Sequence, residues 1–135
     1  MLRPFLAILC VLAACSRGGG SSAPVQPSPD IIGVWDGGWT STRVTRSGTL
    51  VLEFLSTGAS VAGNGRMTNS PCFSVGAFSG TQNGLNLFLS AVAAGGAIDF
   101  SASVDEAGTI MLGDYTVLTG SCAGDSGRWS ARKRP

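Results

Sequence analysis

Residues 82–90 read Gln-Asn-Gly-Leu-Asn-Leu-Phe-Leu-Ser, a turn followed by an alternating run. Asn83 and Gly84 both tolerate the positive φ angles of a type I′ turn, which makes this pair a strong hairpin signal. The leucines that follow occupy every second position. Because successive side chains of a strand point to opposite faces, the leucines share one face. The stretch therefore predicts an antiparallel hairpin with one apolar side.

The same alternation recurs along the chain, with apolar residues at positions 50, 52 and 54 and again at 98, 100, 102 and 104. Residues typical of turns interrupt these runs at intervals of about ten, the spacing of an all-β domain. Apolar residues show no helical period of useful length. The pattern predicts an antiparallel up-and-down meander of eight strands, over residues 32–40, 48–55, 59–67, 72–80, 84–91, 97–104, 108–118 and 127–133.

An open sheet of eight strands would leave two edges unpaired and one apolar face uncovered. Closure into a barrel removes both edges and buries that face. Glycines at 63, 65, 76 and 80 lie within the predicted strands and allow the sheet to bend sharply. We therefore predict a small closed barrel, with a β-sandwich as the alternative.

The N-terminus has a different character. Arg3 precedes a short apolar run, and the run ends in Leu12-Ala13-Ala14-Cys15. Charge, apolar segment and small residues form the pattern of a secretory signal peptide, and the run is shorter than the ~20 residues that span a bilayer. The last four residues resemble the lipobox of bacterial lipoproteins. That resemblance implies cleavage of residues 1–14 and acylation of Cys15, which would anchor the protein to a lipid bilayer.

A linker separates this signal from the predicted domain. Residues 15–30 comprise Cys15 and a stretch rich in Gly, Ser and Pro without apolar periodicity, which predicts a flexible tether. The domain then covers residues 31–135. Ser16 follows Cys15, and the absence of Asp at this position favours sorting to the outer membrane, facing the periplasm.

The cysteines have different predicted fates. Cys10 lies in the discarded segment and Cys15 is the lipid site, which leaves Cys72 and Cys122 in the exported domain. Two thiols in an oxidising compartment most simply form a disulfide. A zinc site is the competing interpretation, but a chain without histidine offers a poor shell for zinc. We therefore predict no metal.

Composition argues against several classes of function. The chain holds nine Lys and Arg and eight Asp and Glu, so loss of Arg3 leaves 8 − 8 = 0 and no field that attracts nucleic acid. Residues 124–127 read Gly-Asp-Ser-Gly, as around the nucleophile of trypsin-like proteases. Without histidine no Ser-His-Asp relay can form, so the run is interpreted as a turn. No catalytic constellation or cofactor site is predicted, and we expect a non-enzyme.

Gly33-Val34-Trp35, at the start of the predicted first strand, resembles the Gly-x-Trp of the calycin superfamily. That superfamily includes lipocalins, avidins and small bacterial protease inhibitors. The resemblance implies that Trp35 closes one barrel end and that a basic residue of the last strand, Arg128 or Arg132, packs across it. Trp39 lies four residues further along the same face and is a candidate for core packing or for a ligand or partner surface.

These observations favour a lipid-anchored, monomeric envelope protein of uncharacterised function that binds a small molecule or a protein partner through its barrel. An inhibitor of an envelope protease or other hydrolase is the alternative function. An open apolar cavity at one barrel end would favour a small-molecule carrier, and a filled interior would favour a protein-binding surface. The sequence leaves this choice open.

Overall fold

The computed structural model describes residues 18–20, 22, 24–93 and 96–135. The signal peptide, the lipobox and Cys15 lie outside these residues, as do residues 16, 17, 21 and 23 of the predicted tether. Eight strands follow one another in sequence: β1 (Gly33–Ser41), β2 (Ser47–Ser56), β3 (Val61–Met67), β4 (Val75–Asn83), β5 (Asn86–Ala93), β6 (Gly96–Val104), β7 (Ile110–Val117) and β8 (Ser126–Lys133).

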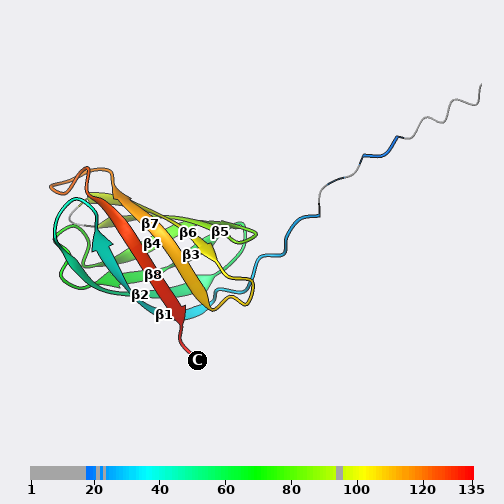
Figure 1. Ribbon diagram of the computed structural model, residues 1–135, viewed down its shortest axis with the longest axis horizontal. Coiled ribbons are helices and arrows are strands. Elements are labelled where there is room, and N and C mark those ends of the chain that lie inside the picture. The colour runs from blue at the N-terminus through cyan, green and yellow to red at the C-terminus, as the bar shows by residue number, and fades with distance from the viewer. Residues whose placement is uncertain (1–17, 21, 23, 94–95) are drawn as a thin grey trace, which may run out of the picture.

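The strands form one closed antiparallel barrel in the order β1 to β8 (Figure 1). Closure occurs between β1 and β8, where Trp35 pairs with Lys133 and Trp39 with Trp129. The predicted all-β meander barrel is confirmed, and the β-sandwich alternative is wrong. Pairing of the first strand with the last satisfies the backbone groups that a sandwich would leave at its edges.

One strand boundary departs clearly from the prediction. The fourth strand begins at Val75 and not at residue 72. The preceding segment turns because the Ser70 hydroxyl accepts hydrogen bonds from the backbone N–H groups of Cys72 and Phe73, each at 3.2 Å. Pro71 has no N–H for a strand ladder. These residues therefore form a loop whose Phe73 side chain is only 2% exposed.

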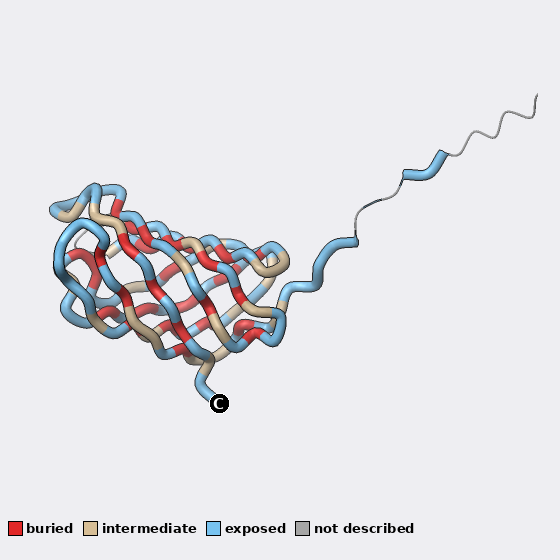
Figure 2. Tube along the Cα trace, viewed as in Figure 1, coloured by how far each residue is buried: buried red, intermediate tan, exposed pale blue. Residues whose placement is uncertain are grey.

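The barrel interior is filled by side chains. Along each strand buried and exposed residues alternate, which appears in Figure 2 as alternating red and blue segments. Aromatic rings occupy much of the core: Trp35, Trp39, Phe54, Phe73, Phe78, Phe100, Tyr115 and Trp129. Phe54 and Phe78 lie 5.0 Å apart between ring centroids, and Phe100 and Trp129 lie 6.0 Å apart.

The strand glycines make room for these rings. A Cβ on Gly63 would lie 2.5 Å from the Phe78 ring, and one on Gly76 would lie 3.0 Å from the Phe73 ring. No Cβ atom tolerates the first distance without displacing the ring. Gly63 and Gly76 were expected to let the sheet bend, and these contacts add a packing role at both positions, because the rings occupy the space that their side chains would take.

The barrel has two distinct ends. Among the loops that the structure describes, 42–46, 68–74 and 118–125 lie at one of them, here called the disulfide end. Loops 57–60, 84–85 and 105–109 form the other, which the N-terminal segment crosses and which is here called the tether end (Figure 1). Within the part of the chain that the structure describes, no helix has the length and apolar character required to cross a bilayer.

Candidate functional site

Trp35 closes the tether end. Its side chain is fully buried, and its indole N–H donates a hydrogen bond to the Ile31 carbonyl at 2.9 Å. The Lys133 ammonium lies 5.9 Å from the centroid of the Trp35 ring and donates to the Asp30 carbonyl at 3.0 Å. The end is therefore capped by an indole, a cation and the chain that enters β1.

The basic residue over Trp35 is Lys133, and the assignment of this contact to Arg128 or Arg132 is wrong. Successive side chains of β8 alternate, with Trp129 and Ala131 buried in the barrel. Arg128 and Arg132 lie on the opposite, outer face of the strand and are exposed. Lys133, the last residue of the strand, lies on the same face as Trp129 and Ala131. Of these three basic residues, it alone can therefore extend its flexible side chain over the indole.

The last residues of the predicted tether are bound to this end of the barrel. The Ser28 hydroxyl accepts a hydrogen bond from the Gly84 N–H at 3.0 Å. The Pro29 carbonyl accepts one at 2.9 Å from the side-chain amide of Gln82, which is only 5% exposed. Residues 28–30 therefore belong structurally to the barrel, and the predicted tether of residues 15–30 is wrong for these last three residues.

A disulfide joins two loops at the opposite end. Cys72 of loop 68–74 is bonded to Cys122 of loop 118–125, with their Cα atoms 5.6 Å apart. Fifty positions of sequence separate them. The predicted disulfide is confirmed, and its place at the strand ends follows from the direction of the chain, since both loops leave their strands at the same barrel end.

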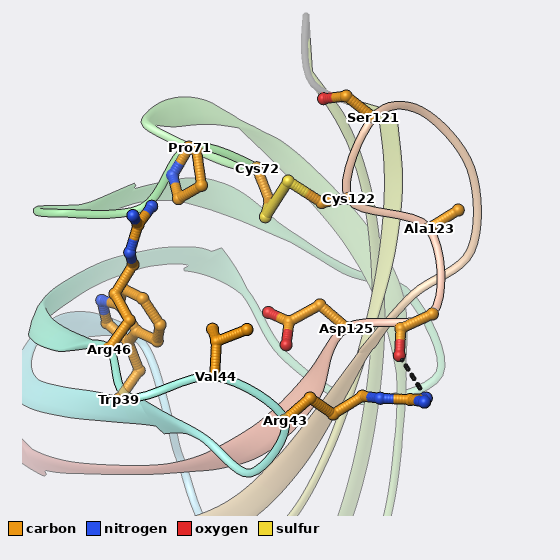
Figure 3. Close-up of a pocket in the computed structure, with 11 residues that line it drawn as sticks. Trp39, Arg43, Val44, Arg46, Pro71, Cys72, Ser121, Cys122, Ala123 and Asp125 are labelled. Atoms are coloured by element: carbon orange, nitrogen blue, oxygen red, sulfur yellow. Dashed lines mark hydrogen bonds between the residues drawn. A yellow bond between two sulfur atoms is a disulfide. The ribbon is translucent and has the colours of Figure 1, made fainter.

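A pocket of about 440 Å³ lies beside this disulfide. Its walls come from the end of β1 and from the three loops of the disulfide end (Figure 3). Val44, Pro71 and the two half-cystines supply apolar surface, and Arg43, Arg46 and Asp125 supply charge. The volume lies within the ~300–1,000 Å³ typical of small-molecule sites.

Trp39 forms part of the pocket floor. It is only 3% exposed, its indole N–H donates to the Thr68 carbonyl at 3.0 Å, and its ring packs edge-on against Tyr115 at 6.1 Å. The sequence left core packing and a ligand surface open for this residue. The contacts make Trp39 a core residue whose outer edge lines the pocket.

Three polar side chains fix the pocket wall. The carboxylate of Asp125 accepts hydrogen bonds from the Ser41 hydroxyl at 2.6 Å and from the Tyr115 hydroxyl at 3.1 Å. Burial raises the pKa of Tyr115 to about 12, and the nearby charge of Asp125 acts in the same direction. Tyr115 is therefore protonated at neutral pH and is a permanent donor. The cluster ties β1 and β7 to loop 118–125.

The Ser41 hydroxyl group also holds loop 42–46 in place. The Ser41 oxygen accepts hydrogen bonds from the backbone N–H groups of Arg43 and Val44, each at 3.1 Å. The Arg43 guanidinium reaches across to donate to the Gly124 carbonyl at 2.8 Å, the contact drawn as a dashed line in Figure 3. The loop that carries both pocket arginines is therefore fixed at its base and across the pocket.

Of the Gly-Asp-Ser-Gly run at residues 124–127, which was predicted to form a turn before the last strand, Gly124 and Asp125 end loop 118–125, whereas Ser126 and Gly127 already belong to β8. Gly124 has a φ of 89°, a conformation that L side chains rarely adopt. Among the described residues, no three His, Cys, Asp or Glu side chains gather as ligands for a metal ion. The groups at the pocket are suited to binding by contact, hydrogen bond and charge.

Sequence reasoning identified Trp39 and the half-cystines but missed Val44, Pro71 and the role of Asp125. The signal available was weak, because loops 42–46 and 68–74 have no apolar period. The chain matches no protein-family model, and no curated protein matches it significantly.

Proposed function

We propose that this protein is a non-enzymatic lipoprotein of the bacterial envelope that binds a small molecule or a segment of a protein partner at its disulfide end. The observation that carries the proposal is the contrast between the two parts of the barrel. Aromatic rings fill the interior, whereas a pocket of about 440 Å³ lies outside that core at the disulfide end. Binding at the end of the barrel suits this arrangement better than storage of a ligand inside it.

The position of the tether supports the same proposal. The chain that leads back to Cys15 leaves the barrel at the tether end, through contacts of Ser28 and Pro29 with the barrel. A membrane that holds Cys15 would then lie on that side. The twelve residues 16–27, between Cys15 and the bound segment, would reach roughly 19 Å as a flexible chain. The pocket, at the other end of the barrel, would face a soluble ligand or partner in the periplasm.

Cys15→Ser is expected to abolish lipid attachment. Diacylglycerol and amide-linked acyl chains supply stable anchoring, since each buried CH₂ contributes about 0.8 kcal/mol and a single chain binds only marginally. The variant should incorporate no labelled palmitate and should stay unprocessed or leave the membrane fraction. Cys10→Ser is the matched control and should be labelled as the wild type. Continued labelling and membrane fractionation of the Cys15 variant would refute the lipoprotein assignment.

Binding itself is tested by native mass spectrometry of the domain purified from its envelope, with a pull-down from envelope extract in parallel. Val44→Ser is the test variant because Val44 is 55% exposed in the pocket, and Val92→Ser is the control because Val92 is 77% exposed on the outer face of β5. A retained molecule or partner should be lost with the first variant and kept with the second. Equal retention by both variants would exclude the disulfide end as the site.

A further inference from the structure

We propose that the pocket at the disulfide end takes an anionic amphipathic ligand, with its acid group at Arg46 and its apolar body against Val44, Pro71 and the disulfide. This inference rests on the proposed binding function and adds the chemical class of the ligand. The class is defined by a carboxylate, phosphate or sulfonate group joined to an apolar portion.

Val44 supplies part of the apolar wall of the pocket. Its side chain is 55% exposed at a position that lines the pocket together with Pro71 and the Cys72–Cys122 disulfide. The edge of Trp39 closes the floor. Burial of apolar surface here would gain about 25 cal/mol per Å². The apolar wall therefore favours a ligand with a hydrocarbon or aromatic body.

The charged side chains of the pocket determine where the acid group of such a ligand binds. The guanidinium of Arg43 donates to the Gly124 carbonyl, and the Asp125 carboxylate already accepts two hydrogen bonds. Arg46 differs from both. Among the described residues, the Arg46 side chain makes neither a hydrogen bond nor an ion pair. The ion pair found there joins Arg134 to Asp36. Arg46 is thus the pocket cation whose five guanidinium donors are all unused, whereas Arg43 already commits one of its donors to Gly124.

The geometry separates an anion at Arg46 from the carboxylate of Asp125. In the view of Figure 3 the Arg46 and Asp125 side chains lie on opposite sides of the Val44 side chain. Two arginines against one aspartate also leave a net charge of +1 at the pocket. An arginine guanidinium forms paired hydrogen bonds with carboxylate, phosphate and related groups. The acid group would therefore lie on the Arg46 side.

The pocket is also ordered before any ligand arrives. Arg46 donates its backbone N–H to the Val44 carbonyl at 2.8 Å, while Ser41 holds the other end of the same loop. The disulfide fixes the opposite wall. Binding would therefore order few additional groups, which lowers its entropic cost.

Two fluorescent dyes with the same aromatic body test the inference on the full domain. Anilinonaphthalene sulfonate carries an acid group and phenylnaphthylamine carries none. The sulfonate dye should bind the wild type more tightly, and Arg46→Gln should weaken it about five- to tenfold, the scale of a partly exposed charge-assisted hydrogen bond. The neutral dye should change less than twofold. Arg128→Gln, on the outer face of β8, is the matched charge control and should change neither dye.

Val44→Ser should weaken the binding of both dyes, whereas Val92→Ser should weaken the binding of neither. Circular dichroism checks that each variant is folded. Equal sulfonate affinity in wild type and Arg46→Gln would overturn the anionic class, while loss of the neutral dye in Val44→Ser would leave the binding pocket standing. If Val44→Ser changes neither dye, the pocket itself and the proposed function both fail.

Competition identifies the source of the acid group. Displacement of the sulfonate dye by octanoate supports a free amphiphile, and displacement by phosphatidylglycerol vesicles supports a lipid headgroup. Either result upholds the inference. The competitors are added to wild-type protein that is saturated with the sulfonate dye. Displacement of the dye by neither competitor would overturn the inference.

Discussion

Deletion of residues 127–135 is expected to eliminate the soluble folded domain. The deleted segment pairs with two strands at once, since Trp129 lies opposite Trp39 of β1 and opposite Gly113 of β7. Its loss exposes both edges and removes a ring that packs against Phe100 at 6.0 Å. Loss of one such aromatic core residue alone costs about 3–5 kcal/mol, against a typical total stability of ~5–15 kcal/mol. The truncated chain should aggregate or be degraded.

The measurement is size-exclusion chromatography with limited trypsin digestion of both proteins. Deletion of residues 134–135 is the control, because it removes only the Arg134–Asp36 ion pair, whose side chains are 56% and 49% exposed, and one backbone hydrogen bond from the Arg134 N–H to the Val34 carbonyl. Exposed pairs contribute about 0–1 kcal/mol, so the control should behave as the wild type. A soluble, monomeric and protease-resistant truncation at 127 would show that β8 does not hold the barrel together.

The barrel was predictable because its causes are local and repeated. Period-two runs such as residues 98–104 determine which side chains enter the core, and Ile98, Phe100 and Val104 are buried as that period requires. Closure follows from the cost of free edges. The cation over Trp35 was misassigned because the family resemblance predicts a basic residue in the last strand but does not say on which face of that strand it lies. Alternation along β8 excludes Arg128 and Arg132 and leaves Lys133.

The candidate site was less predictable because loops build it. Phe73 is buried by a turn that Ser70 stabilises, and nothing in a period of two predicts that turn. The Arg43 contact with Gly124 joins residues 81 positions apart and depends on the conformations of both loops. Sequence reasoning therefore found the disulfide, whose chemistry identifies its partners, and missed most of the surface around it.

Loss of the disulfide is expected to lower the free energy of unfolding by roughly 4 kcal/mol. The bond closes a loop of 50 positions, and the chain-entropy model gives that value from the freedom it removes from the unfolded chain. For a domain of this size the change corresponds to a fall in Tm of roughly 15 °C. The double variant Cys72→Ser, Cys122→Ser should show this fall by calorimetry. Thiol titration of the unfolded wild type should find no free thiol at either position.

Reduction provides the internal control for this prediction. A reducing agent should lower the Tm of the wild type to about that of the double variant and should leave the double variant unchanged. Because Cys72 and Cys122 lie in loops at one barrel end, hydrogen exchange should rise first in residues 68–74 and 118–125, before the strands open. Unchanged melting after reduction would show that the bond does not constrain the domain. Faster exchange throughout the barrel, with no lead in these two loops, would show that the disulfide end is not a separate unit of local stability.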